Sequence, residues 1–163
     1  MRVKGFNVSS WIDAGTATSF IKDIILMGAT HVRYNLSVVS DDVLQDEHRY
    51  DDWLTECINK INNIIRALEE DGYYIKFIID LHAPFGGLDT DRRKTPHKVL
   101  VNRWFRKRWR GHIVRIVEET KRSSYVWAFE PINEPVIPSL RRYKRVMNST
   151  IRLIRRHTRK RIL

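Results

Sequence analysis

The chain contains the run Tyr125-Val-Trp-Ala-Phe-Glu-Pro-Ile-Asn-Glu-Pro135, in which an apolar segment is followed by an amide and a carboxylate. Residues 125–129 are typical of a buried strand, whereas proline has no N–H group to donate to a sheet. We therefore expect the strand to loosen at Pro131 and to end before the second proline. Asn133 and Glu134 would then lie together at its carboxyl end, where barrel enzymes usually carry their functional residues.

Segments with the period of a strand alternate with segments with the period of a helix along the whole chain. We expect strands at residues 3–8, 31–36, 73–81 and 125–130, with a fifth opening at 160–163. We expect helices at residues 16–27, from a cap at Asp51 or Asp52 to about residue 70, at 98–121 and at 138–157. This alternation predicts a parallel α/β sheet with right-handed crossovers.

Two parallel architectures fit the alternation, a doubly wound sheet and a (β/α)₈ barrel. A barrel takes about 250 residues and rarely fewer than about 200. The 163 residues of this sequence supply four strand–helix units and the start of a fifth strand. We expect residues 1–163 to form a single domain, because this length supports one sizeable core. The pattern alone predicts either half of a barrel or a small open sheet.

Composition excludes several classes of protein. Hydrophobic residues make up 42% of the sequence, which argues against disorder, and the single cysteine, Cys57, excludes an internal disulfide. No apolar run approaches the roughly 18 residues of a membrane span, so we expect no membrane association. The first residues lack the apolar stretch of a signal peptide, which predicts a cytoplasmic chain as the sequence is written.

The net charge of +11 is concentrated in the second half of the chain. Residues 1–80 carry 8 basic and 13 acidic side chains, a net charge of −5, and residues 81–163 carry 22 and 6, a net charge of +16. Such a basic half could attract a polyanion, or it could be the solvated face of two helices. The basic residues at 103–110 are expected to point around most of a helical turn, which disfavours a nucleic-acid-binding surface.

Four segments in this order resemble strand motifs of one enzyme family: Gly5-Phe-Asn-Val-Ser-Ser-Trp11, Val32-Arg33, Ile78-Ile-Asp-Leu-His82 followed by Gly86-Gly87, and Phe129-Glu-Pro-Ile-Asn-Glu-Pro135. By these motifs the chain resembles the N-terminal half of the clan A glycoside hydrolases, most closely family 5, the cellulase and endoglucanase family. The resemblance implies a partial TIM (β/α)₈ barrel made of the first four βα units plus the start of a fifth strand. Members of this family are often secreted.

The resemblance also implies a role for each of four polar residues in these motifs. Glu134 would be the general acid/base of a retaining glycosidase, and Asn133 would bind the sugar 2-hydroxyl. Arg33 would orient the nucleophilic carboxylate, and His82 would line the same sugar subsite. Aromatic residues that could form apolar sugar platforms are Trp11, Phe85 and Trp104. Each of these residues also has an ordinary structural alternative: a surface ion pair, a loop or turn residue, or a core aromatic.

The nucleophile implied by the resemblance is a Glu near the end of a seventh strand, which this sequence does not contain. Glu130 and Asp80 lie on the relevant strands, but both are expected too deep in the barrel to replace it. The substrate implied is a polysaccharide or oligosaccharide with β-linkages, β-1,4-glucan or mannan, and the resemblance implies no metal or organic cofactor.

Three hypotheses remain open from the sequence. The chain is part of a hydrolase, or a half-barrel that pairs with a second copy or a companion half-barrel, or a non-enzymatic protein. The last would bind carbohydrate without turnover, or bind a polyanion through its basic half. We also expect an unclosed sheet to expose apolar residues of the barrel interior and to favour association.

Overall fold

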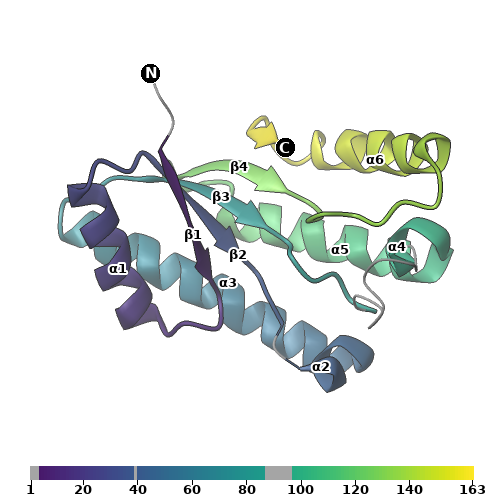
Figure 1. Ribbon diagram of the computed structural model, residues 1–163, viewed down its shortest axis with the longest axis horizontal. Helices are drawn as coiled ribbons and strands as arrows, with labels where there is room; N and C mark the ends of the chain where they lie inside the picture. The colour runs from purple at the N-terminus through teal and green to yellow at the C-terminus, as the bar shows by residue number, and fades with distance from the viewer. Residues whose placement is uncertain (1–3, 39, 87–96) are drawn as a thin grey trace.

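The computed structural model describes residues 4–38, 40–86 and 97–163. Five parallel strands form one sheet in the order β1-β2-β3-β4-β5, so that consecutive strands are neighbours (Figure 1). The strands are β1 (Gly5–Ser9), β2 (His31–Asn35), β3 (Lys76–Asp80), β4 (Val126–Glu130) and β5 (Arg161–Ile162). In a doubly wound sheet the strand order reverses at a switch point, whereas here the strands follow the chain from β1 to β5 without a reversal. The fold is therefore the α/β fold expected for part of a TIM barrel.

The helices pack against one face of this sheet. They are α1 (Ala14–Leu26), α2 (Asp41–Gln45), α3 (Glu47–Glu70), α4 (Lys98–Val101), α5 (Arg103–Thr120) and α6 (Leu140–Ile154). The long helices contact one another in chain order, α1 with α3, α3 with α5 and α5 with α6, as the row of helices in Figure 1 shows. Among these helices, none is long and apolar enough to cross a membrane.

The core lies between the helix layer and the sheet, because each helix carries one apolar stripe. In α3 this stripe comprises Tyr50, Leu54, Cys57, Ile58, Ile61, Ile64, Ile65 and Leu68, all of them buried. The strands contribute alternate residues, among them Val32, Phe77 and Phe129. The hydroxyl of Tyr50 is also satisfied, since it donates to the carbonyl of Ala83 at 2.8 Å. This helix layer keeps the strands in chain order, and that order determines which side chains are neighbours on the opposite face of the sheet.

The expected start of the second long helix is wrong. Helix α3 begins at Glu47, and its cap is Asp46, whose carboxylate accepts from the Arg49 N–H at 3.1 Å. Asp51 and Asp52 therefore lie inside the helix instead of capping it. The apolar pattern suggested a later start because the first turn of α3 is polar, and the same polarity hid the short helix α2.

The helix expected at residues 98–121 is also interrupted. Asn102 adopts an extended conformation with φ −108° and ψ 130°, and its side chain accepts from the Trp104 N–H at 2.8 Å. An asparagine in this role caps a new helix, so α4 and α5 are separate. The last helix is similarly capped by Ser139, one residue after the expected start at Pro138.

The face of the sheet turned away from the helices is mostly polar, whereas we expected it to expose mainly apolar side chains. The register places on this face Asn7, His31, Arg33, Asn35, Lys76, Ile78, Asp80, Ala128 and Glu130. Its apolar members are Ile78, Ala128 and Trp127, the last of which packs against His31 at 4.7 Å between ring centroids, and none of them belongs to the core cluster under the helices. The expectation holds for Trp127, which is partly exposed, but it is wrong around Arg33, where the guanidinium and two carboxylates satisfy one another instead of requiring an apolar cover.

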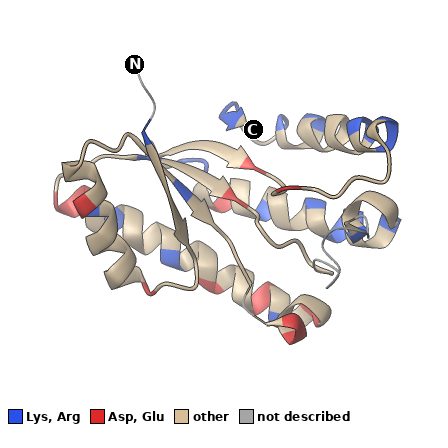
Figure 2. Ribbon diagram, in the orientation of Figure 1, with Lys and Arg blue, Asp and Glu red and all other residues tan. Residues whose placement is uncertain are grey.

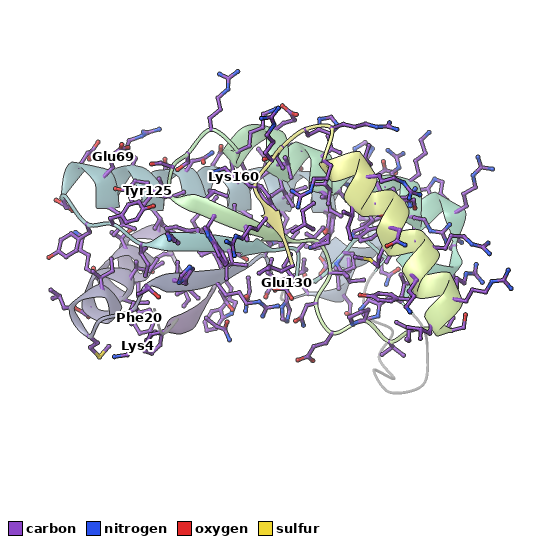
Figure 3. All side chains as sticks on the ribbon, turned by 90° about the horizontal axis from the view of Figure 1, so that it is seen from above. Lys4, Phe20, Glu69, Tyr125, Glu130 and Lys160 are labelled. Atoms are coloured by element: carbon purple, nitrogen blue, oxygen red, sulfur yellow. The ribbon has the colours of Figure 1, made fainter. Side chains whose placement is uncertain are left out.

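The second edge of the sheet is fixed by side chains as well as by main-chain pairing. The ammonium group of Lys160 donates to the Ser123 carbonyl at 2.9 Å and also to the Val126 carbonyl. Tyr125 donates from its hydroxyl to the Tyr73 carbonyl at 2.9 Å. Lys160 and Tyr125 are labelled in Figure 3, which views the sheet from above. These contacts join β4 to β5 and to the turn before β3.

We predict that Gly86→Ala destabilises the fold more than Gly72→Ala does. Both glycines have positive φ, +92° and +74°, so alanine is strained at either position. A Cβ at Gly86 would also overlap the ring of Phe105, whereas nothing lies within 4 Å of a Cβ at Gly72. Denaturant unfolding should show a loss of about 1 kcal/mol for Gly72→Ala and about 2–4 kcal/mol for Gly86→Ala. Equal losses would contradict the packing described for Phe105.

Candidate active site

Three charged side chains meet where β2, β3 and β4 approach their carboxyl ends. The Arg33 guanidinium lies between two carboxylates, with Nε 2.7 Å from Glu130 Oε2 and Nη2 3.0 Å from Asp80 Oδ2. All three project from the polar face of the sheet, and Glu130 is labelled at the end of β4 in Figure 3. One cation thus links three neighbouring strands.

A β-bulge makes this arrangement possible. Phe77 pairs with Val126, but Ile78 pairs with Ala128, so that Trp127 is an extra residue in β4. After the bulge, Asp80 lies opposite Glu130. Without the shift Asp80 would have faced Phe129, because a one-residue slip moves every later side chain to the other face. The bulge therefore decides which β4 residue reaches Arg33.

Two residues beyond the strand ends complete a closed ring of hydrogen bonds. Arg33 Nη2 donates to Asn133 Oδ1 at 2.8 Å, and His82 Nδ1 lies 2.8 Å from Asp80 Oδ2. Asn133 Nδ2 and His82 Nε2 are 3.3 Å apart and close the ring. Arg33, His82 and Asn133, three of the residues expected to share a site, are therefore members of one hydrogen-bonded group.

The ring fixes the hydrogens of its neutral members. Ionised Asp80 can only accept, so His82 carries its proton on Nδ1 and leaves Nε2 free to accept from the Asn133 amide. The Asn133 oxygen then faces Arg33, and the amide nitrogen has one N–H left for a further partner. The result is an oriented amide donor at the rim of the sheet.

Burial and charge act against each other in this group. Asp80 has no exposed side-chain surface, and burial raises its pKa despite the opposing effects of His82 and Arg33. Burial alone would lower the pKa of Arg33, but the hydrogen bond to Glu130 and the charges of Asp80, Glu130 and Glu134 outweigh it, so this pKa is raised. Arg33 therefore remains a cation, and Asp80 is held as an anion at a cost.

Glu134 lies next to the ring, in a strained backbone conformation. Among the described residues it is the only non-glycine with positive φ, at +34°. Such a conformation costs on the order of 1–3 kcal/mol and is concentrated at functional sites. The side chain of Glu134 is exposed, and its charge acts on Arg33. The carboxylate is therefore free to approach a ligand while remaining close to the ring.

The aromatic candidates separate into three environments. Trp11 is 65% exposed and follows β1 at the same end of the sheet as the ring. Phe85 is buried against Tyr50 and other rings, so the expectation that it forms a sugar platform is wrong. Trp104 is partly exposed, but it lines a hollow between α5 and α6 instead of the ring. Gly87, part of the third-strand motif, lies outside the described residues.

Sequence reasoning missed the part that Asp80 and Glu130 play here. It considered them only as replacements for a nucleophile, whereas both are partners of Arg33. A signal was available, because a carboxylate inside a buried strand needs a cation or several donors. No group of three or more His, Cys, Asp or Glu side chains within the described ranges is arranged to hold a metal ion.

Comparison with known proteins gives one family. The model of the cellulase family, glycosyl hydrolase family 5, matches residues 1–163. A search of curated proteins finds no match. The family match spans all four strand motifs together with the helices that support them.

We predict that Asp80→Asn changes the pH dependence of stability. Because the pKa of Asp80 is raised, the native state binds its proton more tightly than the unfolded chain does, and ionisation on raising the pH costs stability. The asparagine variant cannot ionise at this position. The unfolding free energy of the original protein, minus that of Asp80→Asn, should therefore fall as the pH rises from about 4 to 6.

Denaturant titrations of both proteins at several pH values measure this difference. Subtracting the variant removes the contributions of groups common to both proteins, and the range ends before histidine titration dominates. A difference that stays constant, or that grows with pH, would contradict a raised pKa at Asp80.

Proposed function

The chain belongs to glycoside hydrolase family 5, the cellulase family, and from this we propose that it hydrolyses a β-linked polysaccharide, β-1,4-glucan or mannan, with Glu134 as general acid/base. One observation carries the assignment: Glu134, in a strained conformation, directly follows an Asn133 whose amide is fixed by Arg33 and His82. An acid beside an oriented amide donor, at the carboxyl edge of a parallel sheet, suits attack on a glycosidic bond.

Glu134 would act twice in a retaining mechanism. As a carboxylic acid it protonates the glycosidic oxygen, and as a carboxylate it later removes a proton from the attacking water. Its exposed side chain supports this role, because the proton must reach an oxygen of a bound polymer. The strained backbone of Glu134 would limit the directions that the carboxyl group can take.

Asn133 and His82 would bind the sugar beside the bond that breaks. The second N–H of the Asn133 amide is available for the sugar 2-hydroxyl, a contact that strengthens as positive charge develops on the ring. His82 supports that amide through Nε2, and its own orientation comes from Asp80. Trp11, exposed at the same end of the sheet, is our candidate for an apolar platform.

A retaining mechanism needs a second carboxyl group about 5–5.5 Å from the acid. We assign this role to neither Asp80 nor Glu130, because both are paired with Arg33 and Asp80 has no exposed surface. Within the described residues, Nη1 of Arg33 makes no hydrogen bond while Nε and Nη2 do. We propose that Nη1 orients a nucleophilic carboxylate from outside the described residues, either in the same polypeptide or in a companion half-barrel.

We predict that Glu134→Gln abolishes most hydrolysis of a soluble β-1,4-glucan while sparing substrates that need no acid. In an aryl glycoside with a good leaving group, the aryl group departs without protonation. Formation of the glycosyl-enzyme intermediate should therefore persist in the variant, and hydrolysis of that intermediate should be slow. Loss of general acid catalysis should lower reducing-sugar release by about 10²–10⁴-fold. Reducing-sugar assays and burst kinetics measure the two substrates separately.

The matched control is Glu70→Gln, which removes the same charge from an exposed position in α3. It should leave both activities unchanged. Equal sugar release by the original protein and Glu134→Gln would remove Glu134 from the mechanism. Saturable binding of a gluco-oligosaccharide without any turnover would favour the alternative, a carbohydrate-binding protein that does not hydrolyse its ligand.

A further inference from the structure

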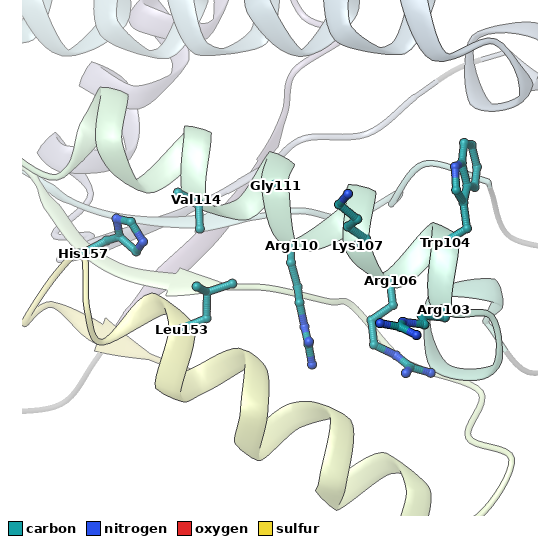
Figure 4. Close-up of a pocket in the computed structure, with 9 residues that line it drawn as sticks. All are labelled: Arg103, Trp104, Arg106, Lys107, Arg110, Gly111, Val114, Leu153 and His157. Atoms are coloured by element: carbon teal, nitrogen blue, oxygen red, sulfur yellow. The ribbon is translucent and has the colours of Figure 1, made fainter.

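A basic groove lies between α5 and α6, on the opposite side of the sheet from the ring. Its volume is about 960 Å³, and Figure 4 shows its lining. Four basic side chains of α5 line it: Arg103, Arg106, Lys107 and Arg110. Their spacing of three, four and seven residues places them on one helix face. The expectation that these five cations point around most of a helical turn is therefore wrong for four of them, and the fifth, Arg108, pairs with Glu47.

The cationic surface extends along α6. A second hollow of about 330 Å³ shares Arg106 with the groove, and its other basic lining residues are Arg141, Arg142 and Arg145. From Arg141 to Leu153 helix α6 rises by about 18 Å, at roughly 1.5 Å per residue. The two hollows thus form one elongated basic surface, and Figure 2 shows the concentration of Lys and Arg on α5 and α6.

Among residues 4–38, 40–86 and 97–163, no acidic side chain lines either hollow. Within the described ranges, the arginines that are hydrogen-bonded there use neutral acceptors: Arg106 donates to the Val99 carbonyl at 3.0 Å and Arg110 to the Thr150 hydroxyl at 2.9 Å. The pKa of Arg106 is lowered by burial and then by Arg142, and that of Arg110 by burial and then by Arg106. The cations repel one another and no carboxylate among the described residues lining the hollows neutralises them, so binding of an anion would relieve this repulsion.

The floor of the groove is apolar. Gly111, Val114 and Leu153 line it between the basic side chains. Nothing lies within 4 Å of a Cβ built on Gly111, so the floor is open at this point. A ligand that fits must present an apolar face to the floor and anionic groups to the sides. An inorganic anion would satisfy only the second requirement.

We propose that this groove binds a linear polysaccharide of uronic acids. A pyranose ring has an apolar C–H face, and its carboxylate projects from the edge of the ring, which matches an apolar floor between cationic rims. Single-stranded nucleic acid instead needs aromatic rings on which successive bases stack. Among the described residues, the aromatic rings that line the groove are Trp104, which packs against Phe105 at 4.8 Å between centroids, and His157, which is held at the other end by Glu118 at 2.7 Å, so no row of stacking rings follows the groove. The inference is independent of the proposed catalytic role of Glu134.

Binding of a fluorescent galacturonic acid oligomer to the whole chain, followed by anisotropy, tests the proposal. A neutral gluco-oligosaccharide and a single-stranded DNA with the same number of charges are the comparison ligands. The uronate oligomer should bind at 50 mM salt, and its affinity should fall steeply by 200 mM, as expected when several cations are neutralised. Any binding of the neutral sugar belongs to the proposed active site, so it should depend little on salt and should not change in the groove variants. Tighter binding of the DNA at equal salt would overturn the proposal in favour of a nucleic-acid site.

Paired variants separate the groove from general charge attraction. Arg103→Gln with Lys107→Gln removes two groove cations, and Arg66→Gln with Arg122→Gln removes two exposed cations elsewhere. We expect the first pair to weaken uronate binding by about tenfold or more, and the second pair to have little effect. Equal losses in the two double variants would show that only net charge matters and would refute the site.

A variant that keeps every charge tests the apolar floor. Gly111→Phe should fill the open floor and abolish uronate binding, with the helical circular dichroism unchanged. Unchanged affinity in Gly111→Phe would show that the polymer does not enter the groove. If the α5 double variant unfolds, Arg141→Gln with Arg145→Gln provides an independent measurement, because these two side chains line only the second hollow. Full retention of affinity in that variant would contradict a continuous surface.

Discussion

The site depends on one cation shared by three strands. Arg33 from β2 lies within 3.0 Å of Asp80 at the end of β3 and within 2.7 Å of Glu130 at the end of β4, and it also donates to Asn133 beyond β4. Two carboxylates this close to each other repel unless a cation lies between them. Arg33 thus makes a polar sheet face possible where a barrel would otherwise need apolar packing. Arg33 also fixes the Asn133 side chain by a hydrogen bond, and Asn133 directly precedes the strained Glu134.

The rest of the fold sets the position of this cation. The helix row α1, α3, α5 and α6 covers one face and keeps the strands in chain order. The bulge at Trp127 brings Glu130 opposite Asp80. A buried ion pair is seldom a net source of stability compared with apolar packing, so its value here lies in geometry. Burial of Asp80 is unfavourable, but Asp80 orients His82, and His82 together with Arg33 orients the Asn133 amide.

The sequence predicted β3 and β4 from their apolar runs, and β1 and β2 from their place in the alternation of strands and helices. It also predicted that Arg33, His82 and Asn133 would meet, since the carboxyl ends of consecutive parallel strands share one edge. It could show that Asp80 and Glu130 each need a cation, but not that Arg33 reaches Glu130, because a one-residue bulge in β4 decides that contact and no local signal marks the bulge. The start of α3 and the break at Asn102 were missed because polar caps, not apolar periodicity, determine them.

A double-mutant cycle between Arg33 and Asp80 tests the central claim most directly. The unfolding free energies of the original protein, Arg33→Met, Asp80→Asn and the double variant give the coupling between the two side chains. If Arg33 holds Asp80 as described, the coupling should be about 1.5–3 kcal/mol, because either single change leaves a charge or an amide without its partner. Additive losses, with a coupling below about 0.5 kcal/mol, would show that the two residues fold independently and that the ring does not organise the site.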